Sequence, residues 1–184
     1  TVETTGTLLV GADIAAAATA IEALGVDSLG LNCATGPQEM AEHVKWLSEN
    51  WTKPISLQPN AGLPELVDGA PYYPLRPQEM ADWLRRFLKE DGLNLIGGCC
   101  GTDIDHIEAL DAMLREEAAD GYRPTPKQRD AQWTPALASL YGAVSYRQEN
   151  AVLSIGERCN ANGSKKFREL QEAGDWDACV AMGR

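Results

Sequence analysis

The sequence lacks an excess of basic residues, and it lacks a long apolar run. Its 184 residues include 16 Lys and Arg against 27 Asp and Glu, which gives a net charge of -11. A nucleic-acid surface needs a basic face, and an anionic membrane attracts Lys and Arg, so we expect neither partner. No apolar run approaches the roughly 20 residues that cross a bilayer. The composition, 44% hydrophobic and 23% charged, is that of a globular protein.

The N-terminus lacks both an initiator Met and the features of a signal peptide. Residues 1–13, TVETTGTLLVGAD, have no basic segment and no apolar core of the kind that directs export. We therefore expect a piece of a longer, cytoplasmic protein. In a reducing compartment, the five cysteines are expected to be thiols or metal ligands rather than disulfides.

Residues 1–119 alternate helix-like and strand-like segments. Apolar residues at helical spacing, often followed by glycine, alternate with short apolar runs. The pentapeptide PQEMA occurs at 37–41 and again at 77–81, with Pro where a helix would begin and Glu in its first turn. This rhythm predicts an α/β fold with a parallel sheet and covering helices, as in a barrel or a doubly wound domain. The expected helices are 12–25, 36–51, 76–92 and 102–118, and the expected strand regions are 26–33, 54–62 and 93–101.

The alternation of helix-like and strand-like segments stops at residues 120–150, where prolines and glycines interrupt the chain. Aromatic residues in this stretch predict a linker that lies against a domain surface, because disordered linkers contain few aromatics. Residues 151–184 then predict a new strand, a polar loop and a helix. The segment therefore begins one further βα unit.

Three cysteines follow predicted strands. Cys33 ends the first strand region, and Cys99 and Cys100 end the third, among glycines that permit unusual backbone angles. Parallel strands end at one edge of their sheet, which is where α/β proteins place their sites. Three thiolates with one open position are typical of a catalytic zinc site. The alternative is that each cysteine packs as a small apolar side chain.

The same motifs resemble a known family. GLNCATGP at 30–37, PNAG at 59–62 and GGCCGTDIDHI at 97–107 are similar to the homocysteine-binding methyltransferase domain. SIGERCNANGSKKFREL at 154–170 is similar to the opening strand and loop of a methyltetrahydrofolate (pterin) domain. The resemblance therefore points to the cobalamin-dependent members, in which a pterin domain follows the homocysteine domain.

The resemblance implies a partial (β/α)8 TIM barrel. Residues 1–119 would supply the last three βα units of the homocysteine barrel, 120–150 the interdomain linker and 151–184 the first βα unit of a pterin barrel. It also implies roles for individual residues. These are zinc ligation by Cys33, Cys99 and Cys100, contact with the substrate by Asn32 and Asn60, and contact with the pterin by Asn160.

The implied activity is zinc-dependent methyl transfer to the thiol of homocysteine, which forms methionine. The methyl source would be methylcobalamin, held by a domain absent from this chain and recharged by methyltetrahydrofolate. We expect this piece alone to be inactive, because part of a barrel leaves sheet edges open. The alternatives are a methyltransferase that uses betaine or S-methylmethionine, and a non-catalytic zinc-thiolate module.

Other candidate residues have plainer expected roles. His43 is expected on a helix surface, His106 in packing or capping, and Cys179 in a core. Cys159 stands where the pterin domain usually has Thr, at a predicted strand end of the second domain, and is not assigned to the metal.

Overall fold

The computed structural model describes residues 1–9, 11–122, 130–151, 153 and 159–183. The chain forms two compact units, Thr1–Ser145 and Tyr146–Arg184, and each is described by itself. None of the helices in the described part has the length and apolar character needed to cross a membrane.

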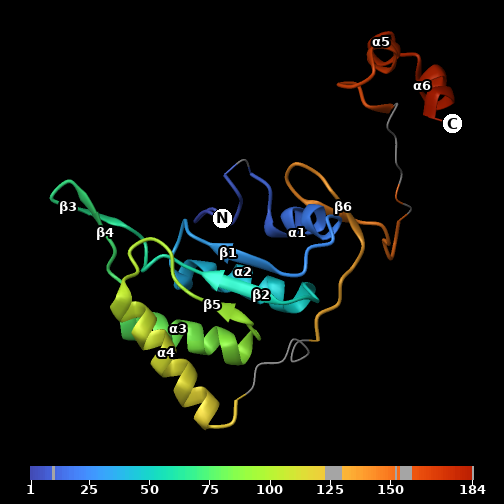
Figure 1. Cartoon of the computed structure of the whole chain (residues 1–184). Coiled ribbons are helices and arrows are strands. Elements are labelled where there is room, and N and C mark those ends of the chain that lie inside the picture. The colour runs from blue at the N-terminus through green and yellow to red at the C-terminus, as the bar shows by residue number, and fades with distance from the viewer. Residues whose placement is uncertain (10, 123–129, 152, 154–158, 184) are drawn as a thin grey trace. The chain divides into compact units, whose positions relative to one another are not determined.

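The first unit is built on a parallel sheet with the strand order β1-β2-β5 (Figure 1). These strands are Leu29–Asn32, Ile55–Gln58 and Leu95–Ile96. The helices around them are α1 (Ile14–Glu22), α2 (Pro37–Asn50), α3 (Pro77–Glu90) and α4 (Ile104–Ala119). The α/β class and the order of helices and strands predicted for residues 12–118 are confirmed. Because the three strands are parallel, the segments that follow β1 and β5 leave the sheet at the same edge.

The PQEMA repeat begins two helices in the same way. Pro37 and Pro77 are the first residues of α2 and α3. Glu39 accepts the Gly36 N–H at 3.1 Å, and Glu79 accepts the Arg76 N–H at 3.0 Å. Each carboxylate satisfies an amide at a helix start, where the helix dipole favours negative charge. The repeat thus sets the beginning of both helices.

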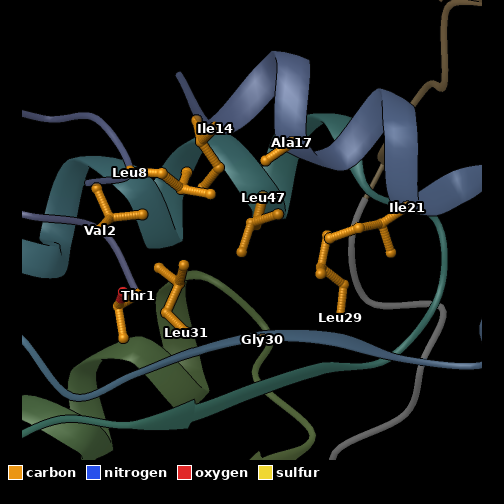
Figure 2. Close-up of a pocket in the computed structure, with 10 residues that line it drawn as sticks. All are labelled: Thr1, Val2, Leu8, Ile14, Ala17, Ile21, Leu29, Gly30, Leu31 and Leu47. Carbon is orange, nitrogen blue, oxygen red and sulfur yellow. The ribbon is translucent and has the colours of Figure 1, made fainter. Parts of the chain in front are cut away.

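The core lies on the face of the sheet that the helices cover. Ile55 and Leu57 are fully buried, and they pack in one cluster with apolar residues of α2 and α3 such as Val44 and Leu84. On the same face, Figure 2 shows side chains of α1 directed toward β1. A small cavity of about 70 Å³ remains there, with apolar side chains around it, among them Ile21. It belongs to the layer that holds α1 against the sheet.

Two short hairpins were not predicted. Strands β3 (Glu65–Val67) and β4 (Ala70–Tyr72) pair antiparallel, and so do β6 (Ala136–Ala138) and β7 (Ala143–Ser145). The first hairpin extends away from the sheet (Figure 1). Its turn is Asp68-Gly69, with φ of 50° and 79°, and an Asp-Gly pair is a strong hairpin signal. That dipeptide was the clue in the sequence.

Most of the 120–150 stretch belongs to the first unit, which extends to Ser145, and aromatic residues in it contact other parts of that unit. The Tyr122 hydroxyl donates to the Leu88 carbonyl at 2.6 Å. Trp133 meets Trp51 edge to face, with ring centroids 5.7 Å apart. The Asp13 amide donates to the Tyr141 carbonyl at 2.8 Å, so the β6–β7 hairpin lies at the start of α1. Residues 123–129 lie outside the described part.

The second unit contains two helices where one was predicted. These are α5 (Lys165–Glu172) and α6 (Trp176–Gly183). Gly174, with φ of 70°, follows α5, and Asp175 accepts the Ala178 amide at 3.0 Å at the start of α6. A left-handed glycine followed by a capping aspartate ends one helix and begins another. The strand predicted at the start of this unit lies largely outside the described residues.

The buried carboxylate of Glu117 in α4 forms ion pairs with two partly exposed cations of α3. It lies 3.1 Å from Arg85 Nε and 2.8 Å from Lys89 Nζ, and its side chain is 8% exposed. We expect Glu117→Ala to lower the free energy of unfolding by about 1–3 kcal/mol, because two partly exposed cations lose a charged hydrogen-bond acceptor. Glu116→Ala is the matched control. Glu116 also pairs with Arg85, but it is 68% exposed, so its loss should cost less than about 1 kcal/mol. Equal effects in urea titrations would contradict the burial argument.

Candidate metal centre

Cys33 follows β1 in an unusual backbone conformation. Cys33 and Ala34 have φ of 59° and 63°, in the left-handed region that side chains rarely adopt. The Cys33 amide still donates to the Gln58 carbonyl at 3.0 Å, and the Thr35 amide donates to the Cys33 carbonyl at 2.8 Å. The chain therefore turns sharply where the strand ends. Backbone strain of this kind occurs at functional sites, where the surroundings maintain it.

Cys99 and Cys100 lie in a tight loop between β5 and α4. The Cys99 amide donates to the Pro59 carbonyl at 2.9 Å, and the Cys99 carbonyl accepts the Thr102 hydroxyl at 2.7 Å. A side chain at Gly98 would overlap Thr102. The loop can close only because Gly98 has no Cβ, and its closure brings two adjacent cysteines to the same place.

The three thiols converge. Cys33 Sγ lies 3.6 Å from Cys100 Sγ, which lies 3.9 Å from Cys99 Sγ. All three sulfurs lie within 4.8 Å of one another. Zinc–sulfur bonds of about 2.3 Å in tetrahedral geometry separate the sulfurs by about 3.8 Å. The cluster can therefore hold a metal ion. Cys33 and Cys99 are half-buried and Cys100 is exposed, so the site opens to solvent.

The thiols influence one another's ionisation. The pKa of Cys33 is lowered by a hydrogen bond from the Ala34 backbone and by hydrogen bonds from Cys100 and Cys99. The pKa of Cys100 is raised by its hydrogen bonds to Cys33 and Cys99 and by their negative charge. Cys33 therefore loses its proton more readily than Cys100. Repulsion among the three negative sulfurs opposes full ionisation of the cluster. A cation among the sulfurs would remove that repulsion.

The structure gives the two predicted substrate asparagines different surroundings. Asn60 is 3% exposed, and its side-chain oxygen accepts the Cys100 amide at 3.1 Å. Asn32 is the last residue of β1 and is exposed. Asn60 therefore contacts the cysteine loop directly, whereas Asn32 is adjacent to Cys33 in the chain. Asn160 is exposed in the second unit, where its side chain accepts the Asn162 amide at 3.0 Å.

Tyr73 is a site residue that the sequence analysis missed. The base of its side chain packs on Gly101, the residue after Cys100, and its pKa is raised by burial and by the charges of the three cysteines. Tyr73 directly follows β4. Because the β3–β4 hairpin was not predicted, the sequence analysis did not place the residue after it near the cysteines.

The remaining candidates have structural positions. His106 is 6% exposed and contacts the capping residue Asp103, with Nδ1 2.6 Å from Oδ1, so the prediction of capping is confirmed. Cys179 is 8% exposed and is a core residue, as predicted. Burial lowers the pKa of His43, whose ring faces Gly6 and not the cysteines. Cys159 is half-buried near Gly183; the strand expected before it lies outside the described residues.

Comparison with known proteins gives the family. The family model described as Homocysteine S-methyltransferase matches residues 1–114. The chain belongs to this family. It is also 50% identical, over all of its 184 residues, to the methionine synthases of Mycobacterium leprae (strain TN) and Mycobacterium tuberculosis (strain ATCC 25618 / H37Rv). The chain spans 15% of the length of these curated relatives.

The resemblance found in the sequence is confirmed by these matches. The similarity to the methionine synthases includes residues 115–184, beyond the region that the homocysteine S-methyltransferase model matches. All three cysteines of the cluster lie inside that region. The cluster is therefore a feature of the part of the chain that defines the family.

Proposed function

We propose that this chain is part of a methionine synthase, in which Cys33, Cys99 and Cys100 hold zinc and the thiol of homocysteine is methylated. The observation that supports this most directly is the convergence of three thiols, within 4.8 Å, at one edge of the sheet. The family match and the methionine synthase relatives supply the substrate and the reaction.

The chain's own groups would act by holding and orienting the substrate sulfur. Three thiolates leave one tetrahedral position for a fourth ligand, and exposed Cys100 places that position within reach of solvent. Zinc, when bound there, keeps a ligated thiol in the thiolate form, which is the nucleophile. An electron-rich site of this kind favours alkylation of sulfur over attack by water. Asn32 and Asn60 are proposed to contact the substrate.

The sheet is proposed to be the last part of a (β/α)8 barrel. In this proposal, residues 1–119 contain three βα units, 120–150 connect two domains, and 151–184 begin a pterin barrel. Among the described strands, β1 and β5 each pair on one side only, and the remaining barrel strands would pair with their open edges. The chain alone is then expected to lack activity, because the pocket needs those strands.

The methyl group is proposed to come from methylcobalamin, which methyltetrahydrofolate regenerates. The similarity of the whole chain, including its tail, to methionine synthases favours this source over betaine or S-methylmethionine. Cobalamin would be bound by a domain outside this chain. Asn160 is the residue of this chain proposed to contact the pterin.

The test is the binding of homocysteine to the full-length gene product with and without zinc. We expect zinc-loaded protein to release about one proton per homocysteine bound near pH 7, because the thiol binds as a thiolate. Isothermal titration in buffers of different ionisation enthalpy measures this release. Homoserine, which has a hydroxyl in place of the thiol, is the control and should release none. Equal homocysteine affinity in the metal-stripped protein would contradict the proposal.

A further inference from the structure

Tyr73 stands directly against the thiol cluster. A Cβ at Gly101, the residue after Cys100, would overlap the Cβ and Cγ atoms of Tyr73. Gly101 itself has a φ of 77°. The base of the tyrosine side chain therefore packs on the backbone of the cysteine loop. The side chain of Tyr73 is therefore placed beside Cys100, the residue that precedes Gly101.

Backbone hydrogen bonds of Ala61 connect the segment that contains Tyr73 to the cysteine loop. The Ala61 amide donates to the Cys100 carbonyl at 2.9 Å, and the Ala61 carbonyl accepts the Leu75 amide at 3.0 Å. On its other side, the Leu75 carbonyl lies 3.0 Å from Nε2 of buried His106, which donates to it. Tyr73 is two residues before Leu75, whose amide and carbonyl are both hydrogen-bonded. Its approach to the thiols is thus set by the fold rather than by a free loop.

We propose that Tyr73 is a positioning residue of the thiolate centre, whose hydroxyl donates a hydrogen bond to Cys100 Sγ and reduces the charge that this sulfur gives to a bound metal. The inference rests on the proposed function. Hydrogen bonds from neighbouring groups are known to adjust the ligands of metal sites. A less donating Cys100 leaves the fourth position more attractive to an anionic ligand, which here is the sulfur of homocysteine.

The test compares Tyr73→Phe with Tyr72→Phe in the full-length gene product loaded with cobalt(II) in place of zinc. Both variants remove one phenol hydroxyl, but Tyr72 is 53% exposed on β4. Thiolate-to-cobalt absorption bands report the charge on the sulfurs. We expect these bands to move to longer wavelength in Tyr73→Phe and to stay unchanged in Tyr72→Phe. Homocysteine affinity should fall roughly tenfold in Tyr73→Phe, within the range for outer-shell partners.

The possible failures are distinguishable. If wild-type protein shows thiolate-to-cobalt bands and Tyr73→Phe leaves them unchanged, the hydroxyl does not donate to a ligand. The inference about Tyr73 is then wrong, while the metal centre is supported. If wild-type protein shows no such bands at all, the proposed metal centre is wrong, and the role of Tyr73 is wrong with it. Equal shifts in both variants would also overturn the assignment, because they would not be specific to the phenol beside Cys100.

Discussion

Cys99→Ser is expected to reduce bound zinc in the full-length gene product from about one ion per chain to a trace, and to abolish methyl transfer to homocysteine. A hydroxyl is a harder ligand than a thiol and does not ionise near neutral pH, so it cannot replace a thiolate. Cys33→Ser and Cys100→Ser are expected to behave alike, because the three sulfurs surround one point. The affinity for zinc should fall by more than about 100-fold, the upper range for loss of an outer-shell partner.

The controls for this series are the two cysteines of the second unit. Cys159→Ser and Cys179→Ser should keep the full zinc content, because the proposed ligands are Cys33, Cys99 and Cys100 of the first unit. Cys179→Ser is expected to lower the stability of the second unit, because the residue is 8% exposed and a buried hydroxyl needs a partner. Elemental analysis gives the zinc content. Full zinc retention in Cys99→Ser would rule out the three-thiol site.

Gly101→Ala is expected to disrupt the same site without removing a ligand. The new Cβ would overlap the base of the Tyr73 side chain, and φ of 77° is unfavourable for alanine. The backbone angle alone costs about 1–2 kcal/mol, and the overlap adds about 1–3 kcal/mol. Relief requires movement of the Cys100 loop or of Tyr73. Because a metal site tolerates displacements of only about 0.5 Å, zinc affinity should fall at least about tenfold.

Gly25→Ala separates the two causes. Gly25 has a φ of 69°, and a Cβ there would meet nothing within 4 Å. It should therefore show the backbone cost in thermal unfolding but bind zinc like the wild type. Chelator competition measures the zinc affinity of both variants. If Gly101→Ala matched Gly25→Ala in both assays, Tyr73 would not be packed on the cysteine loop as described.

Local features of the first unit were predictable because their causes are local. Pro37 and Glu39 begin α2 through contacts within one turn, and the same residues recur in α3. Burial every three or four residues marks each helix face. The short hairpins were missed for the opposite reason. Each of their strands has three residues, too few to establish an alternating pattern, and only the first hairpin carries an Asp-Gly turn, at Asp68-Gly69.

The sequence by itself determined the family, the α/β rhythm and the identity of the three cysteines. Only the tertiary structure brought Cys33 to 3.6 Å from Cys100, 67 residues later, because their meeting depends on β2 lying between β1 and β5 and on the turns that follow. The structure also packed Tyr73 on the cysteine loop at Gly101 and buried Asn60 where it accepts the Cys100 amide. Sequence motifs identify the side chains that are present. Strand order, glycines that allow close approach, and hydrogen bonds between distant segments decide which of those side chains are in contact.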